Sequence, residues 1–254
     1  MLIDSHCHLD AGEFDADRAE VMVAALGAGV HRLVVPGVAV GSFDRVRDCC
    51  RAYPQCIPAY GIHPLYVDQA QESDLSILEQ WLVREEPVAV GEIGLDHFLP
   101  QVDRERQAWF FQAQLKLARD HDLPVLLHVR RAVDPVLKYL RRIPVRGGIA
   151  HAFNGSRQQA EAFIGLGFAL GFGGALTYSG STRIRQLAAT LPLDAIVLET
   201  DAPDIPPAWL DRGRNTPAEL LPIAQVLAEL RGVPLAAVAA QTSATVGRVL
   251  GLRC

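Results

Sequence analysis

A chain of 254 residues, half of them hydrophobic and about a fifth charged, can bury a sizeable core and has the usual length of one α/β barrel. The formal net charge of −5 argues against a wide, non-specific nucleic-acid footprint, which needs many cationic contacts, but not against a nuclease that holds a few nucleotides. Because no repeat, low-complexity tract or linker interrupts the chain, we predict a single domain over residues 1–254.

The chain begins without a basic segment ahead of an apolar stretch, and nowhere are 18 consecutive residues apolar. The sequence therefore predicts a cytoplasmic protein with no membrane segment and no obligate protein partner. Its cysteines, Cys7, Cys49, Cys50, Cys56 and Cys254, show no Cys-x-x-Cys spacing. We expect reduced thiols in place of a disulfide framework or a thiolate zinc site.

Short β-branched runs alternate with longer amphipathic stretches, which is the pattern of βαβ units around a parallel sheet. The expected strands are residues 2–6, 30–36, 56–60, 87–91, 124–128, 148–151, 168–171 and 195–199. Helical patterns include residues 18–26 and 75–84, and two helices close the chain at 217–231, after a Thr-Pro start signal, and at 234–250. Eight strand-helix units predict an α/β fold of the (β/α)8 TIM-barrel type, with a doubly wound open sheet as the alternative.

Histidines and acids stand where the predicted strands end. They are His6 and His8 after the first strand, Glu92 after the fourth, His128 and His151 at the fifth and sixth, and Asp201 past the eighth. The carboxyl ends of barrel strands share one rim, so we expect these side chains to meet. Without cations such a cluster would bury uncompensated charge at several kcal/mol per group, so the sequence predicts a metal centre.

The first two histidines form a His-x-His pair. Side chains alternate along a strand, so His6 and His8 are expected to point the same way as ligands of one ion, while Cys7 packs in the core. Each single histidine or acid also has a structural alternative, as a hydrogen-bonded rim residue or a helix cap. Amidohydrolases with a similar pair bridge two metals by a carboxylated lysine after the fourth strand, where this chain has Glu92.

Six segments resemble the signatures of the TatD-type deoxyribonucleases and follow the same order. They are residues 4–10 (DSHCHLD), 61–64 (GIHP), 91–96 (GEIGLD), 127–130 (LHVR), 151–156 (HAFNGS) and 198–203 (LETDAP). Residues 214–217 (RNTP) match the Arg-Asn-x-Pro element that follows in the family. The chain length and the residues within these motifs are most similar to the YjjV-like branch of the family.

This resemblance implies a metal-dependent hydrolase with two divalent cations, Mg²⁺, Mn²⁺ or Zn²⁺. It implies that His6, His8, Glu92 and Asp201 surround one ion and that Glu92, His128 and His151 surround the other, with Glu92 as the bridge. It also implies hydrolysis of DNA phosphodiester bonds, in related proteins from the 3′ end of single strands. The expected partner is therefore a DNA substrate with a single-stranded end.

In this interpretation two cations that share Glu92 activate a water and polarise the phosphoryl oxygen. Asp201 is expected to orient that water and take its proton. His63, in a turn before a proline, is expected to contact phosphate or protonate the leaving group; the alternative is that it only holds its own turn. Arg130, two positions past His128, is expected to grip a phosphate, with a surface salt bridge as the alternative.

Weaker candidates complete the predicted site. Asn154 and Ser156 are expected to bind substrate, and Glu199, Asp10, Asp96 and Asp204 to support the ligands from behind. The chain departs from the family pattern at His97, at Asn154 and over residues 241–245, and the pattern assigns no role to His97 or Arg131.

Other activities remain open from the sequence. The same centre suits a lactonase or another amidohydrolase, or a deacylase of aminoacyl-tRNA. A metal-binding scaffold without activity is the non-enzymatic alternative, although a scaffold has no need of the full ligand set.

Overall fold

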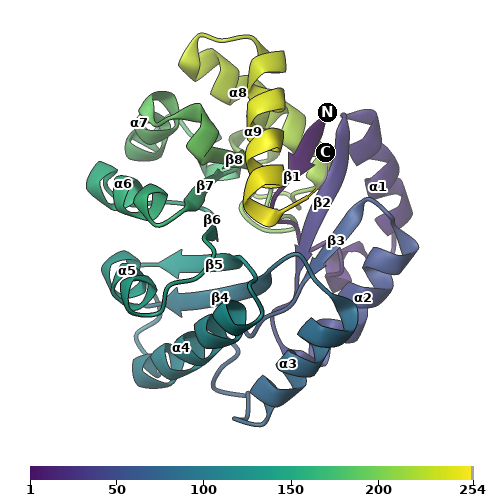
Figure 1. The fold of residues 1–254 in the computed structure, drawn as a ribbon. Helices are drawn as coiled ribbons and strands as arrows, with labels where there is room; N and C mark the ends of the chain where they lie inside the picture. The colour runs from purple at the N-terminus through teal and green to yellow at the C-terminus, as the bar shows by residue number, and fades with distance from the viewer. Residues whose placement is uncertain (253–254) are drawn as a thin grey trace.

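The computed structural model of the protein describes residues 1–252, in which eight parallel strands are surrounded by helices (Figure 1). The strands are β1 (Leu2–Asp4), β2 (Val30–Pro36), β3 (Cys56–Ala59), β4 (Val90–Asp96), β5 (Val125–Arg130), β6 (Gly148–Ala150), β7 (Phe168–Phe172) and β8 (Ile196–Leu198). The α-helices are α1 (Arg18–Gly27), α2 (Phe43–Ala52), α3 (Asp74–Glu85), α4 (Arg104–Asp120), α5 (Val133–Arg142), α6 (Arg157–Gly165), α7 (Thr182–Thr190), α8 (Leu220–Arg231) and α9 (Leu235–Leu250). Short 3-10 segments are η1 (Gly12–Phe14), η2 (Val40–Ser42), η3 (Gly174–Thr177), η4 (Leu193–Ala195), η5 (Ala208–Leu210) and η6 (Pro217–Glu219).

The strands follow one another around a closed parallel barrel. Backbone ladders join β1 to β3 in one set and β4 to β8 in another. A parallel bridge between Tyr60 and Val90 joins β3 to β4. The Ser5 N–H donates to the Leu198 carbonyl at 3.0 Å and joins β1 to β8. The (β/α)8 prediction is confirmed and the open sheet was the wrong alternative.

Apolar side chains fill the barrel at the end away from the carboxyl ends of the strands. They come from each strand or the residue before it, and comprise Ile3, Val34, Ala59, Ala89, Leu126, Ile149, Ala169 and Val197. Val246, Val249 and Leu250 of α9 pack against them, so the last helix closes this end (Figure 1). The polar side chains of interest therefore lie at the opposite, open end.

The bounds of β4 differ most from the prediction. The strand begins at Val90 and continues to Asp96, so Glu92 lies within it and not after it. The pairing of β4 with β5 shifts register between Val90 and Ile93, around Glu92. Glycines interrupt the apolar pattern of this strand, so its full length was not predicted. At Gly94, with a φ of +150°, a Cβ would come within 1.9 Å of the His128 carbonyl oxygen. Only glycine lets the two backbones approach there.

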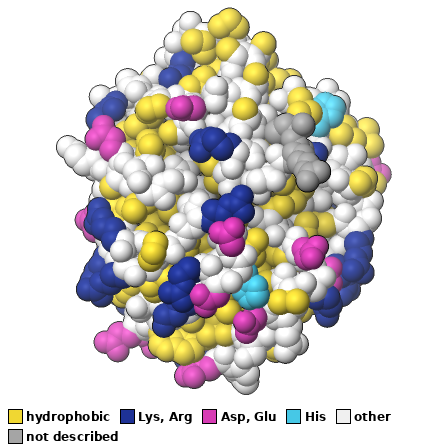
Figure 2. Space-filling view, in the orientation of Figure 1, with side chains coloured by type: hydrophobic (Ala, Val, Ile, Leu, Met, Phe, Trp, Pro, Cys, Tyr) yellow, Lys and Arg dark blue, Asp and Glu magenta, His cyan; other side chains and the backbone are white. Residues whose placement is uncertain are grey.

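The face that carries α9 has mixed charge. Figure 2 shows basic and acidic side chains interspersed there, with no extended field of one sign. Among residues 1–252 no single helix is long and apolar enough to span a membrane, and Pro217–Arg231 with Leu235–Leu250 passes that test only as a pair bent by 110°. Cys7, Cys49, Cys50 and Cys56 are free thiols, whereas Cys254 lies outside the described residues.

Candidate metal centre

Four of the predicted ligands meet at the open end of the barrel. The Nε2 atoms of His6 and His8 lie 3.3 Å apart. Both face Glu92 Oε2, at 3.2 and 3.6 Å, and Asp201 Oδ1, at 3.7 and 3.6 Å. Donor atoms around one tetrahedral Zn²⁺, each at about 2.1 Å, lie roughly 3.4 Å from one another. The spacing and the chemistry of this donor set fit one divalent cation.

The second oxygen of Glu92 faces the other pair of histidines. Glu92 Oε1 lies 3.1 Å from His128 Nδ1 and 2.9 Å from His151 Nε2. The His151 ring also stacks on the His6 ring, with centroids 4.0 Å apart. One buried carboxylate thus stands between two sets of imidazoles, which is the arrangement that a bridging ligand requires.

The His-x-His pair owes its geometry to neighbouring backbones. β1 ends at Asp4, so the segment is not a strand where it was predicted to be. The Cys7 N–H donates to the Val34 carbonyl, while the His8 N–H donates to the Ala202 carbonyl at 2.8 Å. Cys7 is fully buried and the two imidazoles meet, as the alternation argument expected. These hydrogen bonds, and not strand pleating, set the alternation.

Asp201 is positioned by His6 and by two residues to which the sequence analysis gave no role, Asp4 and Asn215. Its N–H donates to the His6 carbonyl at 2.8 Å. The buried Asp4 accepts from the Thr200 N–H and hydroxyl, at 3.0 and 2.6 Å, and from the His6 N–H at 3.2 Å. Asn215 donates to the Thr200 carbonyl at 2.8 Å. The only sequence signal was that Asp4 and Asn215 stand inside recognisable motifs.

Two of the predicted supporting acids stand behind ligand histidines. Asp96 Oδ2 lies 3.0 Å from His128 Nε2, and Glu199 Oε1 lies 3.6 Å from His151 Nδ1. Both acids are buried. A carboxylate at the outer nitrogen fixes the orientation of an imidazole and strengthens it as a ligand.

The other two supporting candidates are placed differently. Asp10 is buried near His8, and burial raises the pKa of its carboxyl. Its backbone carbonyl accepts from Arg45 at 2.7 Å. Asp204 is exposed, and within residues 1–252 its carboxylate makes no hydrogen bond. Its backbone N–H donates to the Asp201 carbonyl at 2.8 Å, and its carbonyl accepts from Asn215 at 2.9 Å.

His63 holds its own turn and also points toward the cluster, and its contact with phosphate stays a prediction. Its Nδ1 accepts from the Leu65 N–H at 3.1 Å, which holds the turn, and its Nε2 lies 3.6 Å from Glu92 Oε1. Burial lowers the pKa of His63 to about 3, so the ring is neutral. Because Nδ1 accepts, the proton is on Nε2, and this side chain offers a hydrogen-bond donor to the site instead of a ligand atom.

Buried glutamines of α4 position the His63 turn. Gln114 accepts from the Ile62 N–H at 2.7 Å and donates to the Ile62 carbonyl at 3.0 Å. Gln107 donates to the Pro64 carbonyl at 3.1 Å and accepts from the Asp96 N–H at 3.0 Å. The sequence reading missed both, although two glutamines seven positions apart share one helix face.

Asn154 and Ser156 already have partners in the fold. Asn154 Oδ1 accepts from Arg183 at 2.9 Å, and Ser156 Oγ accepts from the Gln159 N–H at 3.2 Å as the N-cap of α6. These contacts supply a structural reason for both residues, and their role in binding substrate stays a prediction. Arg130 is half exposed, and its Nη1 lies 3.9 Å from Asp96 Oδ2, a separation too long for a strong ion pair.

The charges of the cluster support one another. Burial raises the pKa of Glu92, but the neighbouring His151 and His6 outweigh it and hold that pKa well below its ordinary value. Burial lowers the pKa of His151, but Glu92 and Asp201 outweigh it and hold that pKa well above its ordinary value. In the metal-free protein a proton on His151 therefore neutralises Glu92, and a cation must displace it.

This arrangement predicts the pH dependence of the metal-free protein. A group whose pKa is raised on folding stabilises the protein below its unfolded pKa, and that stabilisation is lost as pH rises through the folded pKa. The unfolding free energy in chelator should therefore fall above pH 6.5, by up to about 1.4 kcal/mol per pH unit for one proton. Urea denaturation from pH 6 to 9 measures this slope.

The variant His151→Gln isolates the contribution of His151. Asp4, whose pKa is raised to about 8 by burial, contributes a fall of the same sign and remains in this variant. The slope should become shallower in His151→Gln and stay unchanged in His121→Gln, which alters a histidine away from the cluster. Equal slopes in all three proteins would contradict the assignment.

A closed parallel barrel with imidazoles and carboxylates gathered at the carboxyl ends of its strands is the architecture of the amidohydrolase-like (β/α)8 proteins. The family described as TatD related DNase matches residues 3–251, and the chain belongs to this family.

Relatives match the chain over most of its length. The uncharacterized metal-dependent hydrolase YjjV of Escherichia coli K12 is 41% identical over 235 residues, 91% of each chain. The 3′-5′ ssDNA/RNA exonuclease TatD of the same strain is 31% identical over 261 residues, 99% of each chain. The crystal structure of Escherichia coli YjjV superposes with a TM-score of 0.96 at 38% identity, over 99% of this chain and 98% of that one.

Proposed function

We propose that this protein is a metal-dependent hydrolase that cleaves phosphodiester bonds of DNA, acting on single-stranded ends in the 3′-to-5′ direction. One observation carries the proposal: the two oxygens of Glu92 face two separate groups of imidazoles at 2.9–3.6 Å. A carboxylate shared by two cations needs further ligand atoms beside each of its oxygens, and the imidazoles around Glu92 supply them.

The substrate class rests on the relatives. The family is described as TatD related DNase, and the TatD relative is named as an exonuclease of single-stranded DNA and RNA. The YjjV relative is named only as a metal-dependent hydrolase, which supports the reaction type without the substrate. Both names agree with a centre built from imidazoles and carboxylates.

The proposed ligands divide into two sets that share Glu92. One set is His6, His8, Glu92 and Asp201, and the other is Glu92, His128 and His151. A divalent cation supplies a Lewis acid for the phosphoryl oxygen and lowers the pKa of a bound water. The donor set suits Zn²⁺ or Mn²⁺ and accepts Mg²⁺.

The remaining chemistry belongs to the side chains. The Asp201 carboxylate orients the attacking water and accepts its proton. The neutral ring of His63 carries its proton on Nε2, because Nδ1 accepts from the Leu65 N–H. This Nε2–H donates a hydrogen bond to an oxygen of the phosphate. Asp96 and Glu199 hold the rings of His128 and His151 in the orientation that ligation needs.

Removal of the metal tests the proposal directly. Dialysis against chelator should lower the hydrolysis of a single-stranded oligonucleotide and of bis(p-nitrophenyl) phosphate by about a thousandfold or more, since the cation supplies several kcal/mol of transition-state stabilisation. Readdition of Mn²⁺, Zn²⁺ or Mg²⁺ should restore both activities. Metal analysis of the same samples should give two cations per chain.

Other substrates define the contradicting result. Lactones and aminoacyl-tRNA are offered to the same metal-loaded protein as ester substrates. Ester turnover without phosphodiester turnover would overturn the nuclease proposal and leave a hydrolase of another class. Full activity after removal of all metal would overturn the metal-dependent mechanism.

A further inference from the structure

An aromatic ring capped by two cations lies beside the candidate metal centre. The Phe98 side chain, 39% exposed, carries the guanidinium of Arg130 at 3.7 Å and that of Arg131 at 4.7 Å from its ring centroid. The Phe98 N–H donates to Asp96 Oδ1 at 2.8 Å, and the other oxygen of Asp96 contacts His128. This group, which we name the Phe98 platform, is thus fixed to a residue that supports the metal centre.

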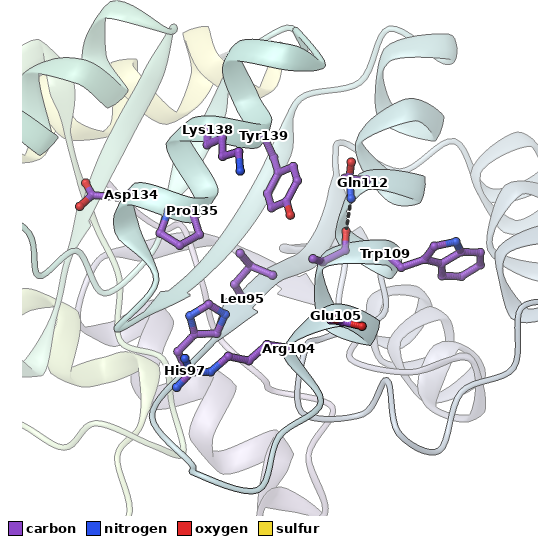
Figure 3. Close-up of a pocket in the computed structure, with 11 residues that line it drawn as sticks. Leu95, His97, Arg104, Glu105, Trp109, Gln112, Asp134, Pro135, Lys138 and Tyr139 are labelled. Atoms are coloured by element: carbon purple, nitrogen blue, oxygen red, sulfur yellow. Dashed lines mark hydrogen bonds between the residues drawn. The ribbon is translucent and has the colours of Figure 1, made fainter.

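A cavity begins next to the Phe98 platform. It lies between α4 and α5, has a volume of about 730 Å³, and is on the outer side of β4, because Leu95 lines it while Asp96 faces the metal centre. Figure 3 shows His97 and Arg104 together at one end, Leu95 in the middle, and Lys138 with Tyr139 toward the other end. We call it the α4–α5 groove.

The platform and the groove are joined by one hydrogen bond. The His97 N–H donates to the Arg130 carbonyl at 2.8 Å and ties the loop after β4 to the end of β5. His97 lines the groove, while the next residue, Phe98, forms the platform. A ligand that leaves the metal centre over the platform therefore meets the mouth of the groove next.

Of the cations along this path, Arg130 faces Asp96 at 3.9 Å, and the other three form no ion pair within residues 1–252. They are Arg104, Arg131 and Lys138, in a protein that as a whole carries a net charge of −5. Two acids, Glu105 and Asp134, also line the groove, and the Asp134 carboxylate accepts a hydrogen bond from Gln159. Burial, and then the charge of Arg104, lower the pKa of His97, and the charge of Asp96 opposes them.

We propose that the Phe98 platform and the α4–α5 groove form a binding track for a single strand of nucleic acid that extends from the metal centre. One base stacks on Phe98 and the guanidinium groups above it, and the following nucleotide enters the groove over Leu95 and Tyr139. Arg104 and Lys138 contact its phosphates. Aromatic and apolar surfaces flanked by unpaired cations are the combination that single strands require, and the volume lies in the range of ligand pockets.

This track rests on the proposed function, since it assigns where the strand lies relative to the phosphodiester that is cut. It explains how a chain with net negative charge holds nucleic acid: the positive charge is local. It also gives roles to His97 and Arg131, for which the motif pattern offered none.

The first test measures binding without catalysis. Fluorescence anisotropy of a labelled octadeoxynucleotide in chelator is compared for the wild type, Arg104→Ala/Lys138→Ala, and the control Arg119→Ala/Arg146→Ala. The control removes two exposed cations whose ion pairs contribute little. The groove variant should bind about tenfold more weakly, and its dependence of log K on log salt should be shallower by about 0.7 for each phosphate that the variant no longer neutralises.

The second test separates stacking from charge. Phe98→Leu should weaken binding of the octamer about 5- to 30-fold, because the aromatic ring on which the base stacks is removed, and Phe98→Trp should restore it. An abasic octamer of the same charge should bind the wild type and Phe98→Leu equally. An equal effect of Phe98→Leu on both octamers would overturn the stacking role.

The outcomes distinguish the track from the proposed function. If the groove variant and its control bind the octamer alike, the track is wrong even when the protein hydrolyses phosphodiesters. If phosphodiesters are hydrolysed, the ratio of kcat/KM for the octamer to that for a dinucleotide should fall in the groove variant and hold in the control. If only lactones or aminoacyl-tRNA are hydrolysed, the proposed function fails while the binding results still judge the track.

Discussion

Replacing Glu92 by glutamine is expected to abolish activity and empty both cation positions. The amide offers one oxygen and one NH₂ group, so one of the two sets of histidines loses the oxygen that now faces it at 2.9–3.6 Å. The negative charge that offsets two cations is removed as well. Loss of several kcal/mol of transition-state stabilisation corresponds to at least about a thousandfold in kcat/KM.

Metal analysis and kinetics of Glu92→Gln check this result together. Glu79→Gln is the matched control, because Glu79 lies on α3, exposed and away from the cluster. The control should keep wild-type metal content and rates. A Glu92→Gln protein with two cations and full activity would show that Glu92 does not bridge them, and the proposed division of ligands would have to be redrawn.

Asp201→Asn is expected to lower kcat by about 100- to 10,000-fold, the range that general-base removal produces. The substitution keeps the size of the side chain. It also suits the backbone, because Asp201 has a φ of +57° and asparagine tolerates this left-handed conformation as well as aspartate does. The amide cannot accept the proton of water, so the pH dependence of kcat on its acid side should disappear.

Asp211→Asn is the control for this change. Asp211 is exposed in the same long connection and also has a positive φ, of +44°, so both substitutions place asparagine in a left-handed position. Its activity should match the wild type. If Asp201→Asn lowers metal content but leaves kcat per bound metal intact, Asp201 is a ligand only, and the proton acceptor is another group.

The sequence indicated the barrel because the alternation of strands and helices survives in every unit. Glycines caused the error in the predicted bounds of β4. Gly91 and Gly94 interrupt the apolar pattern of β4, so the predicted strand ended before Glu92, whereas the real one passes through it to Asp96. Close approach of β4 and β5 at Gly94 depends on residues far apart in the sequence, which no local pattern reports.

The positions of the candidate ligands were predictable because each lies in or just after an apolar strand, and the structure brings their side chains together at one end of the barrel. The residues that hold them were not predictable from pattern. Asp4 binds Thr200 across the junction of β1 and β8, and Gln107 of α4 holds the turn after His63. Such contacts join segments that are distant in sequence, so sequence patterns show these residues only as isolated polar positions. That the chain forms one domain stays a prediction.

Helix α9 closes one end of the barrel, and this determines the side from which a polymer reaches the metal centre. Because Val246, Val249 and Leu250 seal that end, nothing threads through the interior, and the metal centre is reached from a single side. If the substrate is a nucleic-acid strand, as proposed, it must enter and leave by the same opening. A site that is closed at one end suits repeated binding and release of a strand terminus better than continuous passage of the strand past the centre.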